Sequence, residues 1–518
     1  MKKIFLILVI ANFSFAAYAQ EEALSTITEK DLRSHMTFFA SDELQGREAG
    51  TLANDAAALY IMSNLIRFDV NTIPQTGSYL QEIPIQKTVT KNTITFKSGN
   101  DIFSDSLFLL LPTFQSMETT SQVVFAGFGH IDEEAGYNEI KDLDMKNKIV
   151  IVMTGTPGSV SDGSDTSEIF SDAENLKLSR ILLKGAKAIL LVYNPSSNFS
   201  DPYMSGLTSM VNTSEYNLEG GPVNGLPLQI GFISRDVANI ILRPSGHNLK
   251  DIQENILSGG KPFTFEVPGE NVTINTELRV EKLKNRNVIG IIEGSDPVLK
   301  NECIVYSAHF DHMGVSKEGI FNGADDNASG SMALLEIAEA FMSLEKKPAR
   351  TIILAWMNAE EKGLIGSKYY VQNPVMPLST TLLNINLDMV GRSKMETDTG
   401  TFRGMALTIT APRELEYYKD RNSSMFDDLV YESARSAGLK LIDKGVDLEF
   451  GGSDHMSFRS KGVTAIMFHS GIHADLHAIG DDVEKIDFDK MERTARMCFL
   501  LGYRIANAKE SSKNKKRE

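Results

Sequence analysis

The second half of the chain alternates short apolar runs with amphipathic stretches, and no other feature of the sequence restricts the fold as strongly. After Asn287, runs such as Ile304–Tyr306 and Ile352–Trp356 are separated by stretches with apolar residues at helical spacing. Strands that alternate with helices typically form a parallel or mixed sheet that helices cover on both faces. We therefore predict an α/β fold with a central mixed, mainly parallel sheet.

Acidic and imidazole side chains follow each of four apolar runs in this region. A fifth acidic group, Asp325 and Asp326, precedes a helix predicted to begin near Ser329. In open α/β sheets, ligands bind beyond the carboxyl ends of the strands, so we expect these side chains to meet at one edge. The side chains that follow the runs are His309, Asp311, His312, Glu360, Glu361, Asp388, His469, His473, Asp475 and His477.

Each of these features has an ordinary structural explanation when it is taken alone. A lone His-x-Asp sequence is more often an oriented structural histidine, and Asp325-Asp326 could cap a helix. However, six of the nine histidines fall between His309 and His477, and the chain has only two cysteines. Because thiolate clusters are thereby excluded, a metal would be held by His, Asp and Glu. The combination predicts a metal site at the carboxyl edge of the sheet.

Five short motifs, taken in order, resemble those of the co-catalytic zinc exopeptidases. This family includes secreted bacterial aminopeptidases, vacuolar aminopeptidase Y and glutamate carboxypeptidase. The resemblance covers nearly all of the chain after its first residues, and it implies a three-layer zinc exopeptidase fold with two Zn²⁺ ions as cofactors. The motifs are Ala308–Asp311, Gly323–Gly330, Ala359–Ser367, Asn386–Met389 and Leu476–His477.

The resemblance also implies a role for each residue of the site. Asp311 would accept the second ring proton of His309 and so fix its tautomer. Glu360 would be the general base that takes a proton from water and passes it to the departing amine. The implied metal ligands are His309 and Asp388 for one zinc ion, Glu361 and His477 for the other, and Asp325 as the bridge between them.

The sequence departs from the family at the residue before the last ligand histidine. Many members have a tyrosine there, whose hydroxyl can stabilise an oxyanion, whereas this chain has Leu476. His473 or a zinc ion alone could take this role. We also expect Asp454 and His455 to line the substrate pocket, with a purely structural loop as the alternative.

The motifs favour an exopeptidase, most simply an aminopeptidase that removes N-terminal residues from peptides. Glutamate-carboxypeptidase-like or dipeptidase activity is an alternative. A carboxypeptidase should present Arg or Lys to a terminal carboxylate, and Arg392 and Arg459 are candidates for that role. A glutaminyl cyclase-like enzyme would use one zinc ion. A non-catalytic receptor-like protein would lack ligands, whereas all five ligand positions and the base are filled here.

The first residues and the overall charge indicate where the protein works and which partners it has. Lys2 and Lys3, the apolar run 4–17 and the small residues around Ala19 predict a signal peptide, and therefore export to the periplasm or out of the cell. No other stretch is long and apolar enough to anchor the chain in a membrane. With 68 acidic and 52 basic residues, a net charge of −16, nucleic acid is not an expected partner.

The middle of the chain changes to short β-branched runs that are broken by Gly, Pro, Asn and Ser. Segments 124–129 and 146–150 resemble the protease-associated domain that interrupts the peptidase domain in several of these enzymes. The predicted parts are a signal peptide over 1–19, an N-terminal part of the peptidase domain over 20–111, a mostly-β protease-associated domain over 112–267, the catalytic zinc peptidase domain over 268–508 and a charged tail over 509–518.

Overall fold

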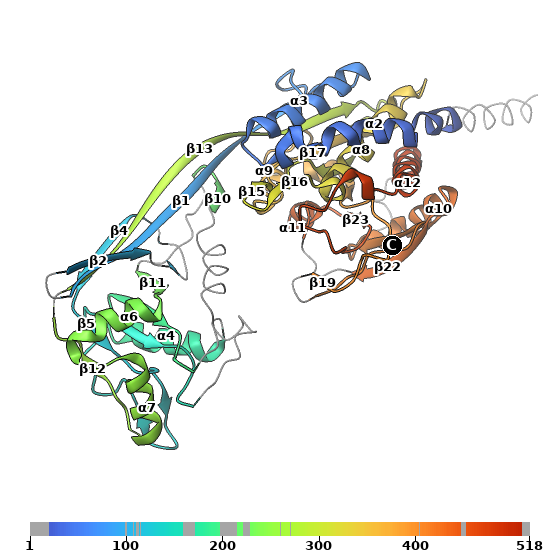
Figure 1. Cartoon of the computed structure of the whole chain (residues 1–518). Coiled ribbons are helices and arrows are strands. Elements are labelled where there is room, and N and C mark those ends of the chain that lie inside the picture. Colours follow the sequence, from blue (N-terminus) through green and yellow to red (C-terminus); the bar gives the residue numbers. More distant parts are fainter. Residues whose placement is uncertain are drawn as a thin grey trace, which may run out of the picture. The chain divides into compact units, whose positions relative to one another are not determined.

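The computed structural model divides into two compact units (Figure 1). Unit 1 comprises Met1–Ile85 and Leu283–Glu518, and unit 2 comprises Gln86–Lys282. The predicted signal peptide and all but the first residue of the predicted tail lie outside the described residues. The residues that the structure describes are 20–98, 101–106, 108–109, 113, 115–158, 171–196, 215–220, 228–259, 261–269, 271–402, 405–446 and 452–509.

The boundaries of unit 2 lie well outside the predicted range 112–267. Two long strands cause this difference, β1 (Leu80–Ser98) and β13 (Val272–Ile292), because each continues from unit 1 into unit 2. Their alternating polar and apolar residues contain no Gly-Pro or Asn-Gly signal at the point where one unit ends and the other begins. At the first boundary, the composition changes near residue 112, after unit 2 has already begun within β1. At the second boundary, it changes near residue 267, before unit 2 ends within β13.

The centre of unit 1 is a mixed sheet in which β13, β17, β14, β18, β23, β21 and β22 are neighbours in that order. Four adjacent strands, β17, β14, β18 and β23, are mutually parallel, whereas β13 and β21 are antiparallel to their neighbours in this group. This confirms the predicted mainly parallel sheet. The bounds of the strands are β14 (Cys303–His309), β17 (Thr351–Met357), β18 (Thr381–Leu387), β21 (Glu414–Lys419), β22 (Lys440–Val446) and β23 (Ala465–His469).

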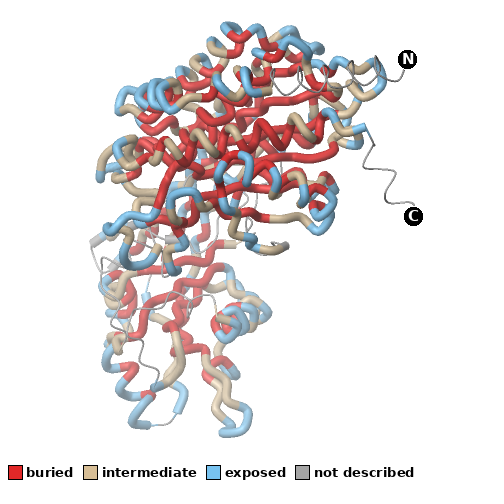
Figure 2. The backbone as a smooth tube through the Cα atoms, turned by 90° about the vertical axis from the view of Figure 1, so that its right-hand side faces the viewer, coloured by how far each residue is buried: buried red, intermediate tan, exposed pale blue. Residues whose placement is uncertain are grey.

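Both faces of this sheet are buried under helices, and Figure 2 shows the buried residues of the chain in red. Along β14, Ile304 and Tyr306 belong to a large hydrophobic cluster on one face, whereas Cys303 and Val305 belong to a second cluster on the other face. Successive side chains of a strand point to opposite faces, so a doubly covered strand must be apolar throughout. This requirement explains the unbroken apolar runs in the sequence.

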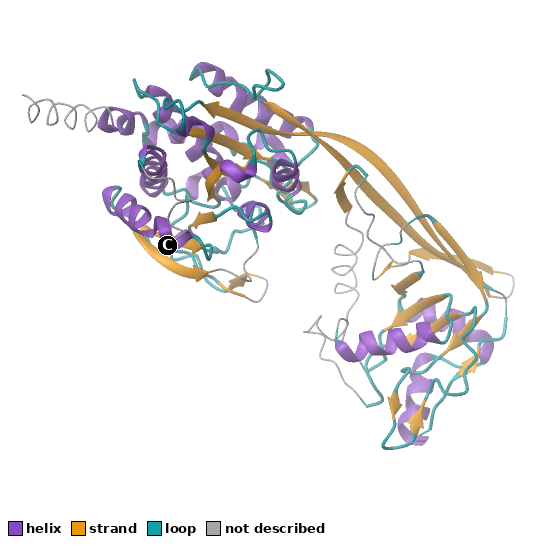
Figure 3. Ribbon diagram, turned by 180° about the vertical axis from the view of Figure 1, so that it is seen from behind, coloured by secondary structure: helices purple, strands orange, loops and turns teal. Residues whose placement is uncertain are grey.

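Helices form the two outer layers of unit 1 (Figure 3). The larger cluster lies under α2, α3, α8, α10 and α12, and the smaller one lies under α9 and α11. The three-layer α/β architecture is therefore confirmed. The bounds of these helices are α2 (Glu29–Phe39), α3 (Leu52–Arg67), α8 (Gly330–Ser343), α9 (Ile365–Gln372), α10 (Asp427–Ser436), α11 (His455–Ser460) and α12 (Phe488–Asn507).

Side-chain caps fix where several of these helices begin. The hydroxyl of Thr51 accepts a hydrogen bond from the backbone N–H of Asn54 at the start of α3, and Asp487 caps α12 in the same way. Between α2 and α3, the polar segment Asp42–Arg47 forms the short helix η1. Other short elements of unit 1 are η4 (Leu299–Asn301), β15 (Gly314–Ser316), β16 (Gly319–Phe321), η5 (Ala324–Ser329), η6 (Leu378–Thr380), β19 (Thr401–Phe402), β20 (Met405–Ala406), η7 (Ser423–Phe426) and η8 (Val483–Lys485).

Unit 2 contains its own six-stranded sheet in the order β12-β5-β8-β9-β11-β3. Its four central strands are parallel, and three helices accompany them among the described residues. The bounds are β3 (Phe108–Leu109), β5 (Val123–Phe125), β8 (Ile149–Met153), β9 (Ala188–Val192), β11 (Gln229–Phe232), β12 (Phe265–Glu266), α4 (Asp172–Leu183), α6 (Arg235–Leu242), η3 (Arg243–Ser245) and α7 (Leu249–Gly259). Further strands are β2 (Asp101–Ser106), β4 (Met117–Ser121), β6 (Ile131–Asp132), β7 (Tyr137–Asn138) and β10 (Glu215–Leu218).

Two further expectations concern the cysteines and the membrane. Cys303 and Cys498 are both buried, and no disulfide joins them. Among the residues that the structure describes, no helix is long and apolar enough to cross a membrane.

Candidate metal centre

The carboxyl ends of the parallel strands bring the predicted side chains to one edge of the sheet. His309 is the last residue of β14, and Asp388 directly follows β18. Glu360 and Glu361 come shortly after β17, and His477 lies in the loop that follows β23. The arrangement follows from the topology, because neighbouring parallel strands end at the same edge.

Asp326 is the carboxylate at the centre of this group. Its oxygens lie 3.3 Å from His309 Nε2 and 3.1 Å from His477 Nε2. A third imidazole, that of His312, lies with Nδ1 3.7 Å from Asp326. The carboxylate is 4% exposed, so these imidazoles rather than water surround it.

Two sets of donor atoms meet at Asp326. In each set the ligand atoms all lie within 4.8 Å of one another, which is close enough to hold one cation. Glu361 accepts from His312 Nδ1 at 2.8 Å, and its other oxygen lies 3.2 Å from His477 Nε2. The two sets are His309 with Asp326 and Asp388, and His312 with Asp326 and Glu361.

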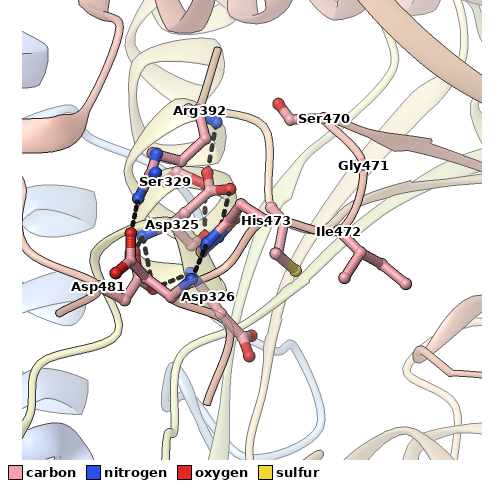
Figure 4. A network of polar contacts seen from close by, with 12 residues as sticks. Asp325, Asp326, Ser329, Arg392, Ser470, Gly471, Ile472, His473 and Asp481 are labelled. Atoms are coloured by element: carbon pink, nitrogen blue, oxygen red, sulfur yellow. Dashed lines mark hydrogen bonds and ion pairs between the residues drawn. The ribbon is translucent and has the colours of Figure 1, made fainter. Parts of the chain in front are cut away.

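The expected bridging ligand, Asp325, has its carboxylate directed elsewhere (Figure 4). One oxygen accepts from the backbone N–H of Gly391 at 2.7 Å, and the other lies 3.4 Å from His473 Nε2. We therefore correct the sequence assignment, since it is Asp326 whose carboxylate faces the other donors. The sequence could not separate the two, because consecutive residues in an irregular segment point in directions that only the backbone decides.

His473 does not line the described cavity either, and it lies in the buried group of polar contacts around Asp325. The carboxylate of Asp481 accepts the backbone N–H groups of both Asp325 and Asp326, each at 3.0 Å (Figure 4). His473 and Asp481 are both fully buried. The network fixes the backbone from which the Asp326 carboxylate projects, so His473 belongs to the support of the site rather than to its substrate-facing surface.

Asp311 supports the site in a different way from the one expected. Its carboxylate accepts the backbone N–H groups of Glu360 at 3.0 Å and Glu361 at 3.3 Å. His309 Nδ1 lies 3.2 Å from the backbone oxygen of Asp311 and 3.9 Å from its carboxylate. Asp311 therefore orients the two glutamates with its side chain and His309 with its main chain.

At this edge of the sheet the carboxylates outnumber the imidazoles, and burying this excess of negative charge costs free energy. Burial has the largest effect on Glu360 and raises its pKa well above 4.5. The charge of His309 lowers this pKa, whereas the charges of Glu361 and Asp388 raise it further. Burial and Asp326 also oppose ionisation of Glu361, yet hydrogen bonds from His312 and His477 lower its pKa to about 2. Buried charges of this kind are typically paired or bound to metal. Imidazole nitrogen and carboxylate oxygen are both suitable ligands for Zn²⁺.

A cavity of about 210 Å³ lies beside the donor atoms. Glu360 lines it together with the acidic and imidazole groups already described, and its carboxylate belongs to neither donor set. The remaining wall is largely apolar. It includes Met389, Phe402, Met405, Met467, Ile472 and Leu476.

His469 is the further imidazole on this wall, and the sequence analysis assigned it no role. Its Nδ1 accepts a 2.7 Å hydrogen bond from the backbone N–H of Gly471, so a neutral ring carries its proton on Nε2. The signal in the sequence was its position at the end of β23, next to a strand whose end carries Asp388. His312 was likewise given no role, although it lies in the loop that follows His309 at the end of β14.

The remaining predicted residues are buried close to the site. Asp454 and His455 are almost fully buried at the start of α11, and neither lines the cavity. Burial raises the pKa of Asp454 to about 7, although the charge of His309 lowers it. Arg392 is paired with Asp475 at 3.0 Å and with Asp398 at 3.5 Å. Among the described residues that line the cavity, none is Lys or Arg.

Comparison with known families identifies the part of the chain that carries this edge. Residues 287–501 match the family described as Peptidase family M28. This range contains every residue of the two donor sets, together with Glu360 and His477.

Individual relatives extend the similarity beyond that range. The chain is 26% identical to a glutamate carboxypeptidase 2 homolog of Caenorhabditis elegans, over 85% of this chain and 62% of that protein. It is 24% identical to aminopeptidase YwaD of Bacillus subtilis (strain 168), over 92% of this chain and 85% of that protein. The chain thus spans only about three fifths of the first of these relatives.

Solved structures show the same fold. An aminopeptidase from Aneurinibacillus sp. strain AM-1 matches with a TM-score of 0.52 and 20% identity, over 94% of this chain and 95% of that chain. A zinc aminopeptidase from Bacillus subtilis, BSAP, matches with a TM-score of 0.51 and 21% identity, over 94% of this chain and 97% of that chain.

Proposed function

We propose that this chain, whose residues 287–501 form a domain of peptidase family M28, is a metal-dependent exopeptidase that removes N-terminal residues from peptides. One observation carries the choice of an aminopeptidase. Among the described residues of the cavity wall, Glu360 is the one carboxylate outside the donor sets, and none is Lys or Arg. Carboxylates attract the ammonium group of a peptide N-terminus, whereas a terminal carboxylate would need a cation.

We further propose that the site holds two Zn²⁺ ions that share Asp326. The ligands would be His309 and Asp388 for one ion, and Glu361 and His477 for the other. His312 would then hold Glu361 in place through the 2.8 Å contact between them. Bound divalent ions would supply Lewis acidity, which polarises the scissile carbonyl and lowers the pKa of water.

Glu360 is the proposed general base. Its carboxylate lines the cavity and is committed to neither donor set, and Asp311 fixes its backbone. A carboxylate in this position can take a proton from the attacking water and release it to the departing amine nitrogen. His469, with its Nε2 proton, is the imidazole available to a substrate carbonyl, in place of the tyrosine that Leu476 replaces.

The apolar wall suggests which N-terminal residues are accepted. Methionines adapt their shape to different side chains, so the pocket should take Leu, Met and Phe rather than one of them alone. Each additional methylene in a hydrophobic pocket changes specificity by about 10–200-fold at most. We therefore expect Leu substrates to be cleaved with at least tenfold higher kcat/KM than Ala substrates, as that range indicates.

A substrate panel tests the proposal directly. Purified protein would be assayed with leucyl, methionyl and alanyl p-nitroanilides and with an N-acetylated leucyl dipeptide, before and after chelation and after return of Zn²⁺. We expect cleavage of the free-amine substrates only, lost on chelation and restored by zinc. Preferential cleavage of the N-acetylated dipeptide would indicate a carboxypeptidase, and a chelator-resistant activity would contradict the metal mechanism.

The two adjacent glutamates provide a matched pair of variants. Glu360→Gln keeps the shape of the side chain but removes the proton acceptor, so kcat should fall by about 10²–10⁴-fold while metal content is retained. Glu361→Gln should lower metal content instead. Elemental analysis and kcat together separate the two roles, and the reverse pattern would exchange them.

Export is part of the same proposal. The first nineteen residues have the charge and apolar pattern of a signal peptide, and the mature chain would begin at Gln20. Mass spectrometry of the protein recovered from the periplasm or medium of an expressing bacterium would measure the new N-terminus. An intact Met1 on the recovered protein would contradict cleavage.

A further inference from the structure

We infer that Arg47, in the segment between α2 and α3, is a positioning residue that fixes the loops of the proposed metal centre. The inference rests on the proposed function, because it concerns how tightly the same centre binds its ions. Arg47 belongs to no donor set and does not line the cavity. It comes from a part of the sequence more than 260 residues away from the donors it would position, since its contacts include Phe310 at a separation of 263 residues.

The guanidinium of Arg47 is fully buried and binds backbone carbonyls of two site loops. Its Nε donates to Phe310 O at 2.9 Å, and Phe310 lies directly after the ligand His309. Its two terminal nitrogens donate to Asn322 O at 2.7 Å and to Gly323 O at 2.9 Å. These two carbonyls lie at the start of the segment that carries Asp326.

The third loop is held from the first turn of α3, where Asn54 and Asn358 donate hydrogen bonds to each other's side-chain oxygens. Asn54 donates to Asn358 Oδ1 at 3.2 Å, and Asn358 donates back to Asn54 Oδ1 at 2.8 Å. Asn54 also donates to the backbone carbonyl of Arg47 at 2.9 Å, which links the two anchors. Asn358 lies two residues before Glu360, so this contact fixes the loop that carries the base and Glu361.

The backbone around Arg47 also approaches the site too closely for a larger residue. Gly46 has φ +64°, and a Cβ there would lie 2.3 Å from Phe321 O and 2.6 Å from Gly314 O. Glycine is therefore required for the backbone to come so near to the β15–β16 hairpin. The close approach places Arg47 where its planar fork reaches three carbonyl groups on two loops, which a lysine ammonium cannot reproduce.

Arg47 could influence metal binding in two opposite ways. As a cation near Asp326, Asp311 and Glu361, it would repel bound metal ions. As an anchor of the loops, it would strengthen binding by holding the ligands in place. Burial lowers the pKa of Arg47 to about 10 against the pull of these carboxylates, so the group stays charged at neutral pH and both effects operate.

Two substitutions separate these effects. Arg47→Lys keeps the charge and loses the fork, whereas Arg47→Met loses both. Zn²⁺ dissociation constants of the full chain would be measured by competition with a chelating indicator. If Arg47 positions the ligands, Arg47→Lys should bind zinc about 10–100-fold more weakly, as expected for an outer partner of a metal site. Unchanged binding by Arg47→Lys, with tighter binding by Arg47→Met, would overturn the inference and leave only the charge effect.

Arg350 provides a matched control for general destabilisation. It is also buried, and its guanidinium donates to backbone carbonyls that include Ala508 O at 2.6 Å. It precedes β17, at the end of the strand away from the metal edge. Arg350→Lys should lower the melting temperature of the metal-free protein without changing zinc affinity. Equal losses of affinity in Arg350→Lys and Arg47→Lys would overturn the inference.

A second pair of variants decides the matter if Arg47→Lys does not fold. Asn54→Ala removes the link to Asn358, whereas Asn64→Ala, later on α3, removes a hydrogen bond to the carbonyl of Tyr60 and leaves the contacts of Asn54 in place. Zinc affinity should fall in Asn54→Ala and not in Asn64→Ala, and equal affinity in the two would overturn the inference. Failure of the wild-type chain to bind zinc would instead refute the proposed function, so the two failures are distinguishable.

Discussion

Each of the two units contains four adjacent parallel strands, and the two groups of strands have different chemistry at their edges. In unit 1, β17, β14, β18 and β23 are four adjacent parallel strands, and in unit 2, β5, β8, β9 and β11 are four more. Every residue of these eight strands is buried except the first residue of β18. Parallel strands therefore provide an edge for a site, but the residues that follow the strands decide whether a site forms.

The residues at the two edges show this difference. The strand ends of unit 1 carry His309, Asp388 and His469, with Glu360 close by. The strands of unit 2 are followed by Ala126, Thr154, Tyr193 and Ile233, none of which is a strong ligand for zinc.

Buried charge is also handled differently in the two units. In unit 2, Glu139 accepts from the backbone N–H groups of Phe128 and His130, and Lys177 binds Glu174 at 2.6 Å. Each buried charge there has local partners. In unit 1, several carboxylates converge on a few imidazoles, which is the pattern of a site that binds cations.

The largest expected effect comes from Asp326, which takes part in both donor sets. Asp326→Asn should remove metal from both sites and abolish turnover, a larger loss than the roughly 100-fold upper range for an outer-shell partner. Asp325→Asn is the control, because its carboxylate faces His473 and Gly391. Metal content by elemental analysis and turnover of leucyl p-nitroanilide would be compared, and metal loss in Asp325→Asn alone would restore the original assignment.

A smaller effect is expected at Asp481, which touches the backbone of the site and none of its donors. Asp481→Asn removes a carboxylate that accepts the N–H groups of Asp325 and Asp326, so zinc affinity should fall by about 10–100-fold. Asp489→Asn, on the partly exposed start of α12, should have no such effect. Zinc titration of both variants measures the difference, and equal affinities would show that the backbone is held without Asp481.

In unit 2, the corresponding experiment should change stability rather than activity. Lys177→Met leaves the carboxylate of Glu174 buried without its ion-pair partner, and breaking a buried pair typically costs about 3–5 kcal/mol. Adding Glu174→Leu should recover most of this free energy of unfolding. Urea unfolding measures the loss and recovery, while turnover of a small aminoacyl substrate should stay unchanged. Loss of turnover in the folded variant would contradict the assignment of all chemistry to unit 1.

The smallest predicted effect is a pH dependence from a buried lysine of unit 1. Burial lowers the pKa of Lys490 from 10.5 to about 8, although Asp325 and Asp487 raise it. Between these two pH values the unfolded chain binds a proton that the folded chain has released. Stability should therefore rise with pH from about 8 to 10.5, by on the order of 1 kcal/mol per pH unit. In Lys490→Met this contribution to the slope should disappear, as urea unfolding at several pH values would measure.

Much of the fold could be predicted because its cause is local in the sequence. The apolar runs ending at His309 and before Asp388 indicated doubly covered strands, and the spacing of Leu334, Ala338 and Phe341 indicated a helix. The boundaries of unit 2 could not be predicted in this way. β1 and β13 continue through them, and a continuous strand has no turn residues to mark a boundary.

In the candidate site, too, some features could be predicted from the sequence and others could not. His309, Glu361, Asp388 and His477 could be named because each follows a strand whose end the sequence marks, and the family resemblance gave them roles. These assignments remain predictions until metal binding is measured. The choice between Asp325 and Asp326 could not be made, since both have the same chemistry and adjacent positions.

The sequence by itself determined the α/β architecture of unit 1 and the type of chemistry at its edge, because hydrophobic periodicity and the residues after each strand are both local properties. Only the tertiary structure decided which carboxylate faces the other donors, that His473 lies behind the site, and that His469 lines the cavity. It also brought Arg47 to the loops near His309 and Asp326. Side-chain direction in irregular segments, and contacts between residues far apart in the chain, depend on how the whole unit packs.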